Sequence, residues 1–149
     1  MSDMNLVDVK PTPWHLWAVG VVALLWNGMG AMDYVMSQTQ NEAYMSGFTP
    51  EQLEFFYRLP AWAVAAWATG VWCGVAGAIA LLFKRRHAVG VFLASLIGAV
   101  LMTFHNYVLI NGMEIAGDAF SLAFAALIIL VALGLYLYSR ALRKQKILV

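Results

Sequence analysis

The chain has 149 residues, of which 62% are hydrophobic and 11% are charged, and its formal net charge is +1. This composition excludes an ordinary soluble domain, and the near-neutral charge gives no reason to expect nucleic acid as a partner. A membrane-spanning helix needs about 20 mostly apolar residues. Four stretches meet this requirement, which predicts an all-α integral membrane protein with a single membrane domain over residues 1–149. The predicted spans are 14–36, 61–83, 88–110 and 119–138.

The first predicted span, 14–36, carries the polar stretch WNGMGAMDY at residues 26–34. Counting about 1.5 Å per residue puts Asn27 roughly 20 Å into a hydrocarbon core of roughly 30 Å. Its amide must find hydrogen-bonding partners there, so we expect it to face protein. Two interpretations are open: Asn27 joins two helices, or it forms the floor of a site for a solute or a lipid headgroup. Gly28 and Gly30 allow another helix backbone to come close.

The connection between the first two spans, 37–60, contains a helix signal of its own. Thr49, Pro50 and Gln52 combine an N-cap residue, a proline suited to the first helical position and a glutamine that can close a capping box. We therefore predict a short amphipathic helix over residues 50–59 that lies on the outer membrane surface. The alternative is a mobile acidic loop.

The second and third spans carry small residues at steps of four, the spacing that lets helix backbones approach closely in lipid. The two stripes are Ala66, Gly70, Gly74 and Ala78 in one span, and Gly90, Ala94 and Gly98 in the other. We predict that these glycines are helix-packing positions. The sequence leaves open whether the stripes meet each other or another subunit.

Three tryptophans lie deep in the predicted spans, away from the interfacial belts where tryptophan is usual: Trp26, Trp67 and Trp72. Packing within the bundle explains them, and no cofactor is required. A lipophilic cofactor such as a quinone or a carotenoid is the alternative. His15 and His87 lie at the membrane boundary, so we expect them to face headgroups rather than to bind haem.

Positive charge marks one side of the predicted membrane protein. One group joins the second and third spans, and another follows the fourth: Lys84, Arg85 and Arg86, then Arg140, Arg143, Lys144 and Lys146. Short segments rich in Lys and Arg stay in the cytoplasm, so both termini are predicted to be cytoplasmic. The short connections favour an up-down-up-down bundle of four transmembrane helices.

A group of polar residues gathers near the outer ends of the first and third spans. Asp33 and Tyr34 share a level with His105 and Asn106, and Asn27 lies below them. Other polar residues on this side are Arg58, Glu114 and Asp118. We predict a shallow, outward-facing polar site here, and ordinary interface chemistry is the alternative. The acidic residues and the histidine show no fixed ligand spacing, so no metal site is expected.

Residues 26–62 combine four motifs, and the combination resembles a group of small, poorly characterised inner-membrane proteins of proteobacteria. The motifs are Trp-Asn-x-x-Gly-Ala-x-Asp-Tyr, Asn-Glu-Ala-Tyr, Phe-Thr-Pro-Glu-Gln and Pro-Ala-Trp. The resemblance covers about the first half of the chain. It implies a multi-pass protein of the bacterial inner membrane, and its members are sometimes loosely labelled transporters. It puts these residues in the family motif without giving them a role: Trp26, Asn27, Gly30, Ala31, Asp33 and Tyr34.

The sequence contains no pattern of residues that points to catalysis in a convincing context, so we expect no enzymatic activity. Our leading hypothesis is a protein that acts by association, as an accessory subunit of a membrane complex or as a homo-oligomer. Its expected partners are the lipid bilayer and a membrane protein. The alternative is a small-solute transporter that works as an oligomer, with Asn27, Asp33 and His105 lining its outer entrance.

Overall fold

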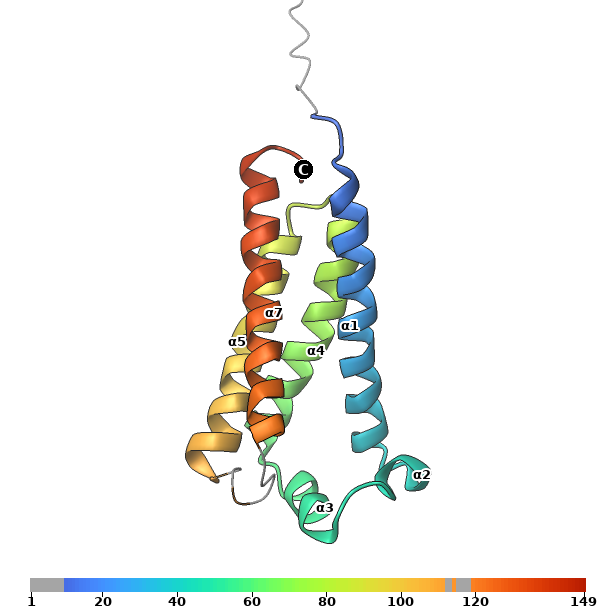
Figure 1. Ribbon diagram of the computed structural model, residues 1–149, viewed down its shortest axis with the longest axis vertical. Helices are drawn as coiled ribbons and strands as arrows, with labels where there is room; N and C mark the ends of the chain where they lie inside the picture. The colour runs from blue at the N-terminus through green and yellow to red at the C-terminus, as the bar shows by residue number, and fades with distance from the viewer. Residues whose placement is uncertain (1–9, 112–113, 115–118) are drawn as a thin grey trace, which may run out of the picture.

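The computed structural model describes residues 10–111, 114 and 119–149, and every regular element in this part of the chain is helical. Four long helices dominate the fold (Figure 1): α1 (Trp14–Gln38), α4 (Ala61–Leu82), α5 (Ala88–Phe104) with its continuation η1 (His105–Leu109), and α7 (Ala119–Lys144). Each of the four is long and apolar enough to cross a membrane. The fold class, an all-helical multi-pass membrane protein, is therefore the one that the sequence predicts.

Two spans end differently from the prediction based on hydropathy. The last helix, α7, continues to Lys144 rather than stopping at residue 138, because its basic residues are exposed and the backbone hydrogen bonds continue regardless of polarity. The third span, predicted as one helix over 88–110, changes at His105 into the π-helical turn η1. Such turns contain an extra residue, which alters the direction of the side chains that follow.

Three of the long helices end in the same cap, and none of these caps uses glycine. The residues Gln40, Lys84 and Lys146 adopt positive φ angles of 52°, 56° and 57° just after α1, α4 and α7. After each of them, a backbone N–H donates to a carbonyl five residues earlier, as Arg85 does to Ala80 at 2.8 Å. Glycine is the usual residue in this cap, so its absence here leaves these helix ends without their usual mark in the sequence.

The four long helices pack in a defined order. Helix α4 packs against α1 and α5, and α5 packs against α7. Helices α1 and α7 approach each other chiefly through ring contacts, with centroid distances of 5.7 Å for His15 and Tyr138 and 6.0 Å for Trp26 and Phe124. We call the face between these two helices the α1–α7 seam. The loose packing along this seam leaves room inside the bundle.

The small residues of α4 and α5 meet at a close helix contact. A Cβ atom on Gly98 would lie 2.6 Å from both the carbonyl oxygen of Ala66 and the amide nitrogen of Gly70. Across the same contact, the Ser95 hydroxyl donates to the Gly70 carbonyl at 2.6 Å. These parts of the two stripes therefore meet each other within one chain.

Other glycines of the predicted packing set lie elsewhere. Gly30 faces Val71 of α4, and a Cβ on Gly74 would overlap the Asn27 side chain. Gly28 and Gly90 face open space: apart from the neighbouring turns of their own helices, no atom of the described residues lies within 4 Å of a Cβ placed there. Packing at these last two positions would require another molecule.

Two short helices cover one end of the bundle, which we call the α3 end (Figure 1). They are α2 (Glu42–Met45) and α3 (Pro50–Tyr57). Helix α3 begins with the predicted capping box: the Thr49 hydroxyl accepts from the Gln52 amide at 3.3 Å, and the Gln52 side chain accepts from the Thr49 amide at 3.0 Å. This connection therefore forms the predicted helix rather than the alternative, a mobile acidic loop.

The opposite end, which we call the terminal end, holds the start of α1 and the end of α7 (Figure 1). The last residues fold back there, and Val149 exchanges backbone hydrogen bonds of 2.9 and 3.0 Å with Lys84 and Arg86. Ile147 and Leu148 are consequently buried in the main hydrophobic core. This core gathers in the terminal half, whereas the α3 half is more open.

Candidate functional site

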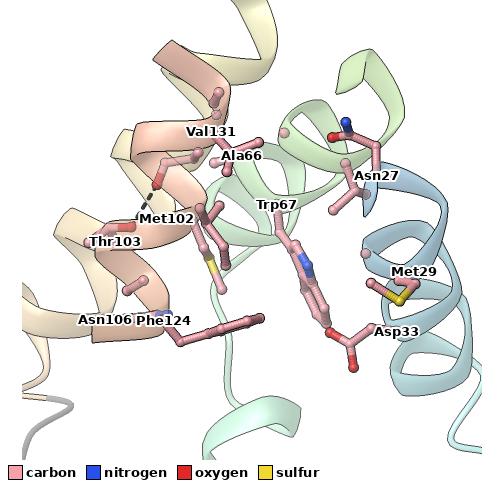
Figure 2. A pocket seen from close by; sticks show the side chains of 18 of the residues that line it. Asn27, Met29, Asp33, Ala66, Trp67, Met102, Thr103, Asn106, Phe124 and Val131 are labelled. Carbon is pink, nitrogen blue, oxygen red and sulfur yellow. Dashed lines mark hydrogen bonds between the residues drawn. The ribbon is translucent and has the colours of Figure 1, made fainter. Parts of the chain in front are cut away.

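The α3 half of the bundle surrounds a cavity of about 760 Å³. Helices α1, α3, α4, α5 and α7 all contribute side chains to its lining. Figure 2 shows Asn27 and Asp33 of α1 on one side, Thr103, Asn106 and Phe124 on the other, and Trp67 projecting between them. Sites for small organic molecules commonly have volumes of about 300–1,000 Å³, so this cavity is large enough to hold one.

Aromatic rings form two walls of this cavity. The first wall runs from α2 to α4, with centroid distances of 5.8 Å for Tyr44 and Phe48, 5.3 Å for Phe48 and Phe56, and 6.2 Å for Phe56 and Trp67. The second wall consists of Trp26 with Phe124 and Phe120 of α7. Tilted and offset contacts stabilise such ring pairs, and the walls present broad apolar surfaces to the cavity.

A few polar side chains interrupt the apolar lining. Asp33 accepts a hydrogen bond from the Tyr44 hydroxyl, which ties α2 to the end of α1. Gln52, Thr103 and Asn106 line the cavity as well. Among the described lining residues there is no Lys, Arg or His, and Asp33 supplies the one carboxylate. The cavity is thus apolar, with hydrogen-bonding groups at a few positions and no positive charge.

Asn27 lies at the edge of this cavity, against α4. Its side-chain nitrogen donates to the Ala23 carbonyl of its own helix at 2.8 Å, and its side-chain oxygen lies beside Gly74. Because a Cβ at position 74 would overlap this amide, the glycine makes room for Asn27. The hydrogen bond within α1 and the contact with α4 together hold the amide in place. Asn27 also lines the cavity. It therefore combines the contact between two helices with a place in the wall of a candidate binding site, the two interpretations that the sequence left open.

Two residues of the predicted polar site lie outside the cavity lining. Tyr34 packs its ring edge-on against Trp67 at 5.0 Å and Trp72 at 6.4 Å. His105 is buried against Trp62 of α4 at 5.1 Å, and its Nδ1 lies 3.1 Å from the Asn106 side-chain oxygen. Successive residues of a helical turn point in different directions, so His105 and Asn106 face different sides. The cavity therefore brings together Asn27, Asp33 and Asn106 of the predicted set.

The other polar residues named from the sequence are also apart from the cavity. Arg58 forms an exposed ion pair with Glu54 at 2.7 Å, Glu114 is exposed, and Asp118 lies outside the described residues. His15 is hydrogen bonded to Tyr138 at 2.6 Å, and His87 is exposed at the terminal end. Within the described part of the chain, His, Cys, Asp and Glu form no cluster of three that could hold a metal ion.

The hydrogen bond from Tyr44 to Asp33 leads to a testable expectation at alkaline pH. The hydrogen bond to Asp33, aided by burial and by the carboxylate's negative charge, raises the pKa of Tyr44 from 10.0 to about 12. The stabilising contribution of this contact is thus complete below pH 10 and is lost as the pH rises toward 12. In a titration of tyrosinate absorbance, subtracting the Tyr44→Phe curve from the wild-type curve should leave one group with a midpoint near pH 12. A midpoint near pH 10 would show that the contact is absent.

No protein-family model, curated protein or solved structure matches this chain. The site must therefore be interpreted from its own residues. Sequence reasoning did not identify Phe48, Thr103 or Phe124 as part of it. The spacing of Phe120 and Phe124, one helical turn apart on the last span, is a signal that could have found one aromatic wall.

Proposed function

We propose that this chain is a non-enzymatic membrane protein that acts by binding a lipophilic molecule in the cavity of its α3 half. The observation that carries the proposal is the cavity itself, about 760 Å³ in volume and walled by aromatic rings. Packed protein interiors rarely keep voids larger than a water molecule, because the surrounding atoms lose their dispersion contacts. A lipophilic occupant would restore those contacts.

The composition of the lining favours binding over catalysis. Its described titratable groups are Asp33, Tyr44 and Tyr107, and Asp33 is already hydrogen bonded to Tyr44. General acid–base or nucleophilic catalysis needs a base within reach of a second reacting group. A few hydrogen-bonding groups on an apolar wall are instead typical of a site that orients a ligand.

The position of the seam favours a ligand that comes from the bilayer. Both α1 and α7 have exposed apolar surface along their lengths, including Leu25, Met29 and Leu127. A molecule dissolved in the lipid could pass between these two helices without crossing water. We further propose that the membrane is the bacterial inner membrane and that both termini are cytoplasmic, since the Lys and Arg groups gather at the terminal end.

A pair of neighbouring alanines on α7 tests this proposal. Ala125 lines the cavity, whereas Ala126 is exposed and does not. We expect wild-type protein and Ala126→Phe, released from native membranes and analysed by native mass spectrometry, to carry a bound lipophilic molecule. Ala125→Phe should lose it, because the added ring occupies the binding volume. Equal occupancy in the two variants, or wild-type protein without any such molecule, would contradict the proposal.

Association with another protein is the second candidate function. Gly28 and Gly90 face open space, and outward-facing small residues allow another helix to approach closely in lipid. A partner subunit or a second copy of the chain could pack there. The same mass measurement separates these cases: a defined hetero-complex would favour an accessory subunit. A homo-oligomer without a ligand would favour the transporter hypothesis.

A further inference from the structure

A second cavity continues the first one along the α1–α7 seam. It is an open groove rather than an enclosed space, with a volume of about 340 Å³, and it lies nearer the terminal end. It shares Trp26, Val131 and Leu135 with the larger cavity, so the two are adjacent. The rest of its lining consists of Ala18, Val19, Val22 and Ala23 of α1. Apart from the indole N–H of Trp26, the described lining residues carry no polar side-chain group.

The two cavities lie one after the other along the α1–α7 seam. Their combined lining is polar at the α3 end and apolar at the terminal end. Asp33, Gln52 and Asn106 supply hydrogen-bonding groups at the α3 end, whereas small aliphatic residues such as Val19 line the terminal end. Asp33 lies fourteen residues beyond Val19 on the same helix, which corresponds to about 21 Å along the seam. One leaflet of a hydrocarbon core is about 15 Å thick. The seam is therefore long enough to hold the tail of a membrane lipid, with several ångströms left at the α3 end for its head.

The hydrogen-bonding groups at the α3 end indicate the kind of head that fits there. The side-chain oxygens of Gln52 and Asn106 already face the Thr49 amide and His105, which leaves their NH₂ groups to donate to a ligand. One oxygen of Asp33 accepts from Tyr44, and the other can accept from a ligand hydroxyl. The carboxylate would repel a phosphate or carboxylate head, and no Lys or Arg of the described lining offsets it.

We infer that the ligand is a single-tailed lipid whose head carries hydroxyl groups and no negative charge. The inference rests on the proposed function, because it assigns a chemical class and an orientation to the molecule bound in that cavity. The head lies among Asp33, Gln52 and Asn106. The tail passes Trp26 and ends in the second cavity, beside Val22. Apolar burial of the tail supplies the affinity, and the polar groups fix the direction.

Photoaffinity labelling with two monoacylglycerols tests both the class and the orientation. One probe carries a diazirine at the end of a long tail, and the other carries it next to the head. With the full chain in phosphatidylcholine nanodiscs, we expect the tail-end probe to label the second cavity near Ala18 and Val22. The head-end probe should label α3 residues such as Gln52. Reversed labelling would overturn the orientation, and labelling spread over the lipid-facing surface would overturn the site.

Two neighbouring valines provide a matched control for the tail. Val22 lines the second cavity and Val21 does not, yet both are exposed enough to accept a larger side chain. Val22→Phe should reduce tail-end labelling about tenfold, which corresponds to about 1.4 kcal/mol, whereas Val21→Phe should leave it unchanged. Equal labelling of the two variants would overturn the path of the tail.

Competition with an unlabelled lipid tests the head. A monoacylglycerol should displace the probe at a concentration about tenfold lower than a lysophosphatidic acid with the same tail. Equal competition would overturn the assignment of an uncharged head. That result would leave the proposed function standing, since the loss of the ligand from Ala125→Phe is measured independently of its head chemistry.

Discussion

Replacing Gly98 by Ala is expected to lower the free energy of unfolding by about 1–3 kcal/mol, the range typical of overpacked interiors. The new methyl group would lie 2.6 Å from the Ala66 carbonyl oxygen and from the Gly70 amide nitrogen. Both are backbone atoms of α4, so no side-chain rotation can relieve the overlap. The two helices must move apart, which also lengthens the 2.6 Å hydrogen bond from Ser95 to Gly70.

The matched control lies on the same helix. Apart from the neighbouring turns of α5 itself, no atom of the described residues lies within 4 Å of a Cβ added at Gly90, so Gly90→Ala creates no overlap and gains helix propensity. Titration of a denaturing detergent into mild detergent micelles, followed by circular dichroism, would measure both variants. We expect Gly98→Ala to unfold at a lower denaturant fraction than wild type, and Gly90→Ala at the same fraction or higher. Identical transitions for the two variants would mean that α4 and α5 do not meet at Gly98.

Replacing Gly74 by Ala should also cost about 1–3 kcal/mol, but for a different reason. The added methyl group would overlap the Asn27 amide, which is held by its hydrogen bond to the Ala23 carbonyl at 2.8 Å. Asn27 must then leave its rotamer, and its amide loses a partner in an environment that offers little water. The cost should thus depend on which residue occupies position 27.

A double-mutant cycle tests this dependence directly. In an Asn27→Ala background the overlap is gone, so Gly74→Ala should have almost no effect on the free energy of unfolding. The coupling energy between the two positions is then expected to be about 0.5–3 kcal/mol, as for residues in contact elsewhere. Additive effects would show that Asn27 does not lie against α4, and the interpretation of this residue would have to change.

The candidate site could be predicted only in part, and the difference has a geometric cause. The sequence predicts Asn27, Asp33 and Asn106, which line the cavity, because polar residues in apolar helices are conspicuous. The depth of His105 in its span predicts that it joins the same cluster, but depth does not give the direction in which a side chain points. The burial of His105 against Trp62 depends on the rotation of α5, which the sequence does not reveal.

The sequence by itself determined the four apolar helices, the N-cap of α3 at Thr49 and the gathering of basic residues in two segments. These features depend on local composition and on short-range hydrogen bonds, which a linear pattern records. Only the tertiary structure decided that α1 and α7 meet chiefly through aromatic side chains, that Gly98 meets Gly70, and that rings from α2, α3, α4 and α7 wall one cavity. Those outcomes depend on how each helix is rotated about its axis, and small residues and aromatic rings far apart in the chain set that rotation together.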